Sequence, residues 1–276
     1  MRPGQLTSPV MSVLRLLWQH RALVAVLVRR ELSARYRASF FGYLWSLLNP
    51  LLLLLVYAVV FTSIFEPRFP GGDPYPLFLF TGLLPWLFFS GAVLDSAVSL
   101  VDNGPLLAKV MCPPEIFPAV TVLSHLVHHL LALPVLLAAL AGSAVMGWHP
   151  FPWTVLLLPL ALVPWVLLTG GVALATAALA VHFRDLRDLV NHLLNLLFFS
   201  SPILYSLQGL EVPQLVRRLL HLNPMASVVE VYRDLAFAGR VAGVEKWAIA
   251  AAVAVVAWWL GAAVFTRLRE TLVEAV

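Results

Sequence analysis

The chain has 276 residues, of which 61% are hydrophobic and only 12% carry a charge. A soluble domain has about 25% charged residues, so this composition excludes a soluble globular fold and indicates a polytopic membrane protein. The single cysteine, Cys112, excludes an internal disulfide and a multi-cysteine metal site. In a membrane protein the net charge of +4 reports topology and contact with anionic lipid, and it gives no sign of a nucleic-acid partner.

Residues 1–37 are predicted to form a cytoplasmic N-terminal segment with an amphipathic helix lying in the membrane interface. Apolar residues such as Leu17, Val24 and Leu27 recur at helical spacing with arginines beside them, which is typical of interfacial helices. As a seventh span this stretch would be short, and it contains Arg15 and Arg21. The same arginines interrupt the apolar run that a signal peptide would need, so no cleaved leader is expected.

The membrane is predicted to begin directly after this segment. Arg35 and Arg37 cannot cheaply enter hydrocarbon, whereas residues 38–65 contain no charged side chain. Aromatic residues are dense at the junction, where tyrosine and tryptophan favour the headgroup level. We therefore expect the chain to turn at Phe41-Gly42 and to enter the bilayer there.

Charge-free windows predict an all-α integral membrane protein with a transmembrane domain over residues 38–266. A spanning helix needs roughly 20 mostly apolar residues, and the long apolar stretch between Glu115 and Arg184 is divided by the Gly- and Pro-containing residues 142–152. The six expected spans are about 40–65, 75–94, 117–141, 153–181, 189–206 and 247–266.

The distribution of basic residues predicts the orientation. Twelve of the 18 Lys and Arg residues fall on the side of both termini and six on the other, so both termini, including the tail 267–276, are expected in the cytoplasm. The last outer loop, 207–240, is basic but half apolar. It is expected to form re-entrant helices, broken at Asn223-Pro224 and packed against the bundle, because irregular backbone at membrane depth needs protein or water around it.

The sequence contains no nucleotide-binding motif of its own. A phosphate-binding loop needs a glycine-rich turn that ends in lysine, and neither Lys109 nor Lys246 has that context. No cofactor is therefore expected in this chain, and any ATP and Mg that power it would be bound by a partner subunit.

Four segments, in order, resemble one known family. RELSARYRASFFGYLWSLLNPLL, LLAKVMCPPEIFP, HFRDLRDLVNHLLNLLFFSSPILY and LNPMASVVEVYRDLAF are similar to the permease subunits of ABC-2 type transporters that export polysaccharides (O-antigen, capsule or teichoic acid). The resemblance runs from about Leu27 to the tail. It implies a homodimer with two ATP-binding cassette subunits in the bacterial cytoplasmic membrane, exporting a lipid-linked polysaccharide between the two copies.

The inner loop, residues 103–118, is a candidate contact with the ATPase. Its core, Pro105–Met111, has the length of a short helix and is stopped by Pro113-Pro114. It is either a stiff knob that fits a groove of the partner, as the resemblance suggests, or a plain turn. The interface helix is either a second contact or a lipid anchor. The residues assigned to coupling are Leu106, Lys109, Pro113, Pro114 and Glu115 in the loop and Arg29, Glu31, Arg35 and Arg37 on the interface helix.

Charges of alternating sign precede the fifth span. Arg184, Asp185, Arg187 and Asp188 form either a self-neutralising helix start or a gate at the cytoplasmic entrance of the path, and the sequence favours neither reading.

Polar residues within spans are functional candidates because burying them in hydrocarbon is costly. His125, His128 and His129 share one helix face, but HLVHH lacks the glutamate of H-E-x-x-H. We expect hydrogen bonds between helices or a position near a headgroup, with no metal. Asn191, His192 and Asn195 are the better candidates for a path wall.

Aromatic side chains are candidates for a glycan path, because sugar rings stack on flat aromatic faces. Tyr57, Phe61 and Phe65 follow one another at intervals of four residues on one helix face, and Phe198, Phe199 and Tyr205 lie in the fifth span. The alternative for each residue is ordinary packing or a place in the interfacial aromatic belt.

The sequence therefore predicts a transport subunit without catalytic residues. The alternatives are an ABC-2 exporter of a drug or small lipid and a membrane glycosyltransferase. A glycosyltransferase would need clustered acidic residues at one membrane face, whereas Asp95, Asp102 and Glu115 are expected to be scattered.

Overall fold

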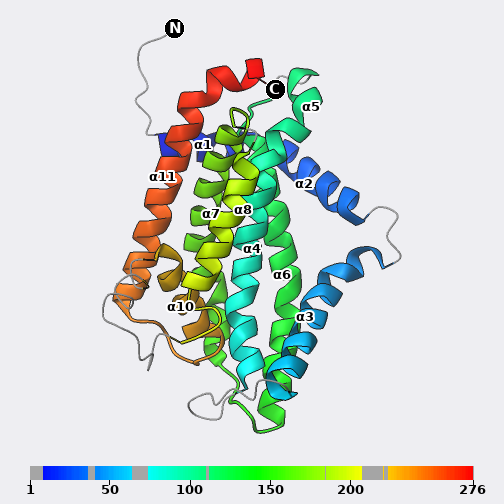
Figure 1. Ribbon diagram of the computed structural model, residues 1–276, viewed down its shortest axis with the longest axis vertical. Coiled ribbons are helices and arrows are strands. Elements are labelled where there is room, and N and C mark those ends of the chain that lie inside the picture. Colours follow the sequence, from blue (N-terminus) through cyan, green and yellow to red (C-terminus); the bar gives the residue numbers. More distant parts are fainter. Residues whose placement is uncertain are drawn as a thin grey trace.

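The computed structural model describes residues 9–36, 41–63, 74–109, 112–183, 185–206, 220 and 223–275, and all regular elements in these ranges are helices (Figure 1). This confirms the predicted all-helical class. The elements are α1 (Pro9–Gln19), α2 (Arg21–Tyr36), η1 (Gly42–Leu44), α3 (Trp45–Ser63), α4 (Tyr75–Asp102), α5 (Gly104–Lys109), α6 (Ile116–Val145), η2 (Trp153–Leu157), α7 (Leu158–Ala180), α8 (Leu186–Ser200), α10 (Pro224–Ala236) and α11 (Val244–Ala275).

Four helical stretches in the described ranges are long and apolar enough to cross a membrane. They are α4, α6, η2 with α7, and α11, while the apolar part of α3, Trp45–Val60, is shorter. At 15 residues, α8 is below the roughly 20 residues that a perpendicular span needs. That the chain crosses the membrane six times therefore stays a prediction.

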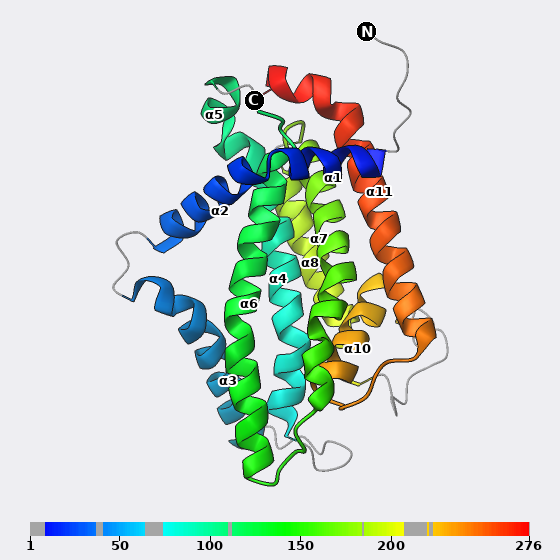
Figure 2. The ribbon, with the colours of Figure 1, turned by 180° about the vertical axis from the view of Figure 1, so that it is seen from behind.

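Helices α7 and α11 pack closely along one seam of the bundle. Gly171 and Gly261 face each other so closely that a Cβ on either one would collide with the backbone of the opposite helix. Small residues allow such close backbone approach between membrane helices. In Figures 1 and 2, α4 and α6 lie beside α7 in the bundle, while α3 leans away from it.

The ends of α4 and α8 differ from the predicted span limits. Helix α4 was expected to end near residue 94 but continues past Asp95 to Asp102, because a charged side chain does not stop a helix where it reaches a polar partner. Helix α8 ends at Ser200, short of residue 206, because Ser201 precedes Pro202 and is extended, with φ −92° and ψ 147°.

The N-terminal segment forms two helices rather than one. Helix α1 lies across one end of the bundle and α2 slants outward from it (Figure 2). Val13 of α1 and Val24 of α2 are buried against the bundle. The expected turn is present at Gly42, whose φ is +50°. The end of the bundle that α1 crosses also carries α5 and the last turns of α11, and we call it the α1 end.

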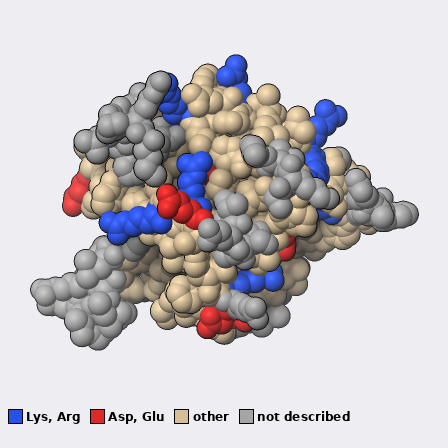
Figure 3. Space-filling model, turned by 90° about the horizontal axis from the view of Figure 1, so that it is seen from above, with Lys and Arg blue, Asp and Glu red and all other residues tan. Residues whose placement is uncertain are grey.

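Charged side chains of both signs are interspersed over the α1 end of the molecule (Figure 3). Helix α11 passes through the predicted tail without a break, and Leu272 is fully buried there. Of the predicted re-entrant segment, residues 207–219, 221 and 222 lie outside the described residues. Helix α10 begins at Pro224, as the Asn223-Pro224 break predicted, and packs on α4, α7 and α11.

Candidate functional site

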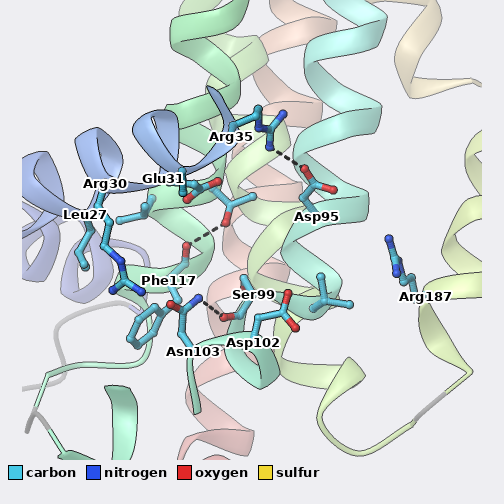
Figure 4. Close-up of a pocket in the computed structure, with 14 residues that line it drawn as sticks. Leu27, Arg30, Glu31, Arg35, Asp95, Ser99, Asp102, Asn103, Phe117 and Arg187 are labelled. Carbon is cyan, nitrogen blue, oxygen red and sulfur yellow. Dashed lines mark hydrogen bonds and ion pairs between the residues drawn. The ribbon is translucent and has the colours of Figure 1, made fainter. Parts of the chain in front are cut away.

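A charged cavity of about 470 Å³ opens between α2, α4 and the start of α6 (Figure 4). Its charged lining consists of three arginines and three carboxylates. Helix α2 brings Arg30, Glu31 and Arg35, α4 brings Asp95 and Asp102, and α8 brings Arg187.

Two residues that line this cavity, Arg35 and Asp95, belong to a three-residue network that joins three helices. Arg35 Nη2 of α2 donates to Asp95 Oδ2 of α4 over 3.0 Å. The same oxygen lies 2.8 Å from His125 Nε2 of α6. The Arg35 and Asp95 side chains are 38% and 39% exposed, so the network forms a partly hydrated latch between α2 and the bundle.

Glu31 lies beside this latch and is affected by its own burial. Desolvation raises the pKa of Glu31 above its ordinary value of 4.5, although the nearby Arg35 charge opposes the shift. The carboxylate is therefore less stable here than in water. Glu31 was assigned to contact with the ATPase, and in this structure it turns toward the cavity (Figure 4).

Polar side chains elsewhere in the cavity bond mainly to helix backbone. Asn103 Nδ2 donates to the Ser99 carbonyl over 2.9 Å, and Thr121 Oγ1 donates to the Phe117 carbonyl over 3.3 Å. Arg187 reaches in from α8 on the side of Asp102 (Figure 4). The guanidinium groups can bind phosphate oxygens, and the carboxylates balance their charge.

A second cavity, of about 530 Å³, lies on the other side of Arg35. It is lined by α3, α4 and the three histidines of α6. The His128 Nδ1 atom lies 3.3 Å from Ser46 Oγ, and His129 Nε2 lies 3.4 Å from the hydroxyl of Tyr232. These contacts confirm the prediction that the histidines form hydrogen bonds between helices. No group of three or more potential metal ligands occurs in the described part of the chain.

The acidic residues expected to be scattered are not all separate. Asp95 and Asp102 line the same cavity as Glu31, which is a correction to the sequence-based expectation. Glu115 lies apart, as expected. From its charge, Asp95 was placed beyond the end of a span, and so its position inside α4 was missed. The available signal for the Asp95–His125 pair was an acid and a histidine in neighbouring membrane helices.

The inner loop contains the short helix that the sequence predicted, α5, followed by Pro113 and Pro114. Leu106 is half-buried, and the Lys109 side chain lies outside the described residues. Glu115 is only 2% exposed and binds Arg269. It therefore does not present a charge to a partner, and its predicted role in coupling could act only through Arg269. Burial raises the pKa of the nearby Cys112 thiol.

The remaining coupling and gate residues are mostly exposed. Arg29 is exposed on α2. Asp185, Arg187 and Asp188 are exposed at the start of α8. Arg37 and Arg184 lie outside the described residues, so the pairing of Arg184 with Asp188 and the gate itself stay predictions.

The predicted path residues divide between α3 and α8. Tyr57 is half-buried against the main core cluster, the Phe61 side chain and all of Phe65 lie outside the described residues, and Asn191 and Asn195 are exposed on α8. Three aromatic residues lie at or beyond the end of α8: Phe198 packs on Trp86 with 5.6 Å between ring centroids, Phe199 is 66% exposed, and the Tyr205 hydroxyl donates to the Phe199 carbonyl over 3.2 Å.

These features define a helical, multi-pass membrane protein with a charged cavity at the α1 end. Residues 22–237 match the model of the ABC-2 type transporter family. The chain belongs to that family.

Named relatives match over nearly the whole chain. It is 37% identical to the O-antigen export system permease protein RfbA of Myxococcus xanthus, over 97% of this chain and 100% of the relative. It is 31% identical to the protein of the same name from Klebsiella pneumoniae, over 91% and 94%. It is 25% identical to the polysialic acid transport protein KpsM of Escherichia coli, over 92% and 96%.

Proposed function

We propose that this chain is the transmembrane permease subunit of an ABC exporter that moves a lipid-linked, O-antigen-like polysaccharide across the bacterial cytoplasmic membrane. The observation that carries the proposal is its 37% identity to an O-antigen export permease over 97% of this chain. The apolar helices and the family membership support a transport subunit rather than an enzyme.

The proposed topology has six spans, with the α1 end in the cytoplasm. Helices α3 and α8 would supply the two spans beyond the four long helices, and the segment 207–240 would be re-entrant. The excess of Lys and Arg on the side of the termini supports this orientation.

The power source in this proposal is a pair of ATP-binding cassette subunits that bind ATP and Mg beneath the α1 end. Helix α5 projects from that end (Figure 1) and is the proposed contact. Helix α2 is a second candidate contact, since the Arg35–Asp95 latch joins it to α4. Closure of the ATPases would then act on α5 directly and on α4 through α2.

The proposed path runs between two copies of the chain, along α3 and α8. Both helices have large apolar residues that are exposed in a single copy, including Leu55 at 59% and Leu196 at 67%. Asn191 and Asn195 are also exposed on α8, and amide side chains facing hydrocarbon would be costly. A second copy or a hydrated glycan path would cover them.

We propose that the charged cavity is where the lipid-linked glycan first meets the permease, and that it takes a headgroup that carries phosphate. Arg30 and Arg187 are exposed at its rim. Guanidinium groups bind phosphate with two parallel hydrogen bonds. The neighbouring carboxylates would keep this binding weak enough for the substrate to move on.

Reconstitution with the cognate ATPase tests the proposal. Proteoliposomes that contain the complex should move a lipid-linked glycan to the opposite leaflet in an ATP-dependent manner, measured by protection from a glycosidase. The matched control carries an ATPase that binds ATP without hydrolysing it. ATP hydrolysis stimulated by small hydrophobic compounds, together with no movement of glycan, would instead support a drug or small-lipid exporter.

A further inference from the structure

The turn that follows α8 is held by side chains from two other helices. Ser201 and Ile203 in this turn are fully buried. The carbonyl oxygens of three consecutive residues, 202 to 204, each accept a hydrogen bond from a side chain: Arg233 Nη1 donates to Pro202, Arg233 Nη2 to Ile203 over 2.9 Å, and the Tyr75 hydroxyl to Leu204 over 2.7 Å.

Both ends of helix α10 contact this turn. Arg233 lies in its last turn, whereas Asn223 caps its first turn by accepting from the Met225 amide over 2.9 Å. The Asn223 Nδ2 atom donates to Ser201 Oγ over 3.0 Å and lies 3.3 Å from Ser200 Oγ. The end of α8 is therefore attached to α10 at two points.

The surface of α4 at Phe78 and Gly82 fits closely around the Arg233 guanidinium. The Arg233 Cζ atom lies 3.7 Å from the centroid of the Phe78 ring, a cation–π contact. One helical turn later, a Cβ at Gly82 would collide with Arg233 Nη2. Arg233 is 7% exposed, and a buried cation at membrane depth is costly unless acceptors such as these carbonyl oxygens offset its burial.

The other side of α10 is fixed to α11. Lys246 Nζ lies 2.8 Å from Glu230 Oε2 and 3.1 Å from Asp234 Oδ2. Helix α10 thus connects α4, the end of α8 and the start of α11.

We propose that Arg233 is a positioning residue for transport, which makes the end of α8 and helix α10 move as one body. The joint consists of Asn223, Arg233 and the turn 200–204. A displacement of the end of α8 would then move α10 by the same amount. The inference rests on the proposed function for its role in export, but the joint itself can be measured without any substrate.

The first test weakens the joint from both of its sides. Arg233→Lys keeps the charge but cannot span two carbonyl oxygens with one planar group, and Gly82→Ala places a methyl group in the guanidinium seat. Both variants should increase amide hydrogen exchange in residues 198–206. In the complex with its ATPase they should lower export about tenfold, the loss expected for one charge-assisted hydrogen bond. ATP hydrolysis and the level of membrane-inserted protein should stay near those of wild type.

Arg240→Lys is the matched control, because Arg240 binds Asp234 next to the joint but does not contact the turn. It should change neither hydrogen exchange nor export. If Arg233→Lys leaves the exchange of residues 198–206 unchanged, the proposal is wrong whatever the substrate is. If wild type itself moves no glycan while the exchange results hold, the joint stands and the proposed substrate fails.

A disulfide across the joint distinguishes a joint that stays rigid during transport from one that must open. In a Cys112→Ala background, Ser201→Cys and Asn223→Cys place two thiols where the side chains now lie in hydrogen-bond contact. If α8 and α10 move together, the oxidised form should export at least as fast as the reduced form, and the disulfide should restore export to Arg233→Lys. Export that stops on oxidation and returns on reduction would overturn the proposal. So would loss of folded protein in both weakened variants that the disulfide does not repair.

Discussion

Glu115 and Arg269 form an ion pair of 3.4 Å between the end of the inner loop and the last part of α11. The Glu115 side chain is 2% exposed, whereas that of Arg269 is 46% exposed. The carboxylate therefore depends on the arginine more than the arginine depends on the carboxylate, because only the carboxylate has lost its water.

Arg269→Gln should destabilise the protein by roughly 1–3 kcal/mol, since it leaves a buried carboxylate without its cation. Glu115→Gln should cost less because Arg269 remains hydrated. Thermal unfolding in detergent measures both, and the double variant should recover part of the loss. Equal melting temperatures for the two single variants would contradict this asymmetry.

The Arg35–Asp95 latch should contribute little to global stability and more to the docking of α2. A double-mutant cycle with Arg35→Gln and Asp95→Asn should give a coupling energy of roughly 0.2–1 kcal/mol, as expected for a partly exposed pair. Hydrogen exchange of α2 should rise in either single variant while that of α7 and α11 stays unchanged. An unchanged exchange rate in α2 would show that other contacts hold this helix.

Glu31 should make stability depend on pH. Because burial raises the pKa of Glu31 above 4.5 in the folded protein, the folded state binds the proton more tightly than the unfolded state. Its favourable contribution is complete below pH 4.5 and is lost as the pH rises through the folded pKa.

Glu31→Gln should accordingly melt at a higher temperature than wild type at neutral pH, with the difference vanishing below pH 4.5. Glu245→Gln, which removes a carboxylate at an exposed position on α11, is the matched control. A difference that grows on acidification would reverse the assigned sign.

The aromatic stripe on α3 should act on transport rather than on folding. Replacing Tyr57 and Phe61 by leucine keeps apolar bulk and removes the flat ring faces. The double variant should melt near the wild-type temperature and hydrolyse ATP normally while exporting long glycans poorly. Export at the full rate would mean that these two rings only pack against neighbouring helices and that α8 lines the path instead.

Accessibility labelling should define the topology. In a Cys112→Ala background, single cysteines at positions 68 and 211 should react with an impermeant maleimide in intact cells, and those at positions 2 and 274 should react only after lysis. Labelling of position 2 in intact cells would contradict both the orientation and the six-span plan.

The long helices could be predicted from the sequence because their apolar runs are long enough to cross a bilayer. The short inner-loop helix and the break before Pro224 were predicted from proline positions, which act locally. The Asp95–His125 contact could not be predicted from spacing, because it joins residues 30 positions apart on separate helices. Nor could the partners of Arg233, since main-chain carbonyls have no signature in the sequence.

Helix α11 fixes the distance between two contacts that lie near its own two ends. Lys246 binds Glu230 and Asp234 of α10, while Arg269 binds Glu115, about 35 Å away at 1.5 Å per residue. One residue inserted between them would turn Arg269 by about 100° away from Glu115, whereas four inserted residues would nearly restore its direction but move it about 6 Å along the axis. The length of α11 is therefore set in whole residues by its two ends, and the span cannot be adapted to a thicker bilayer without giving up one of them.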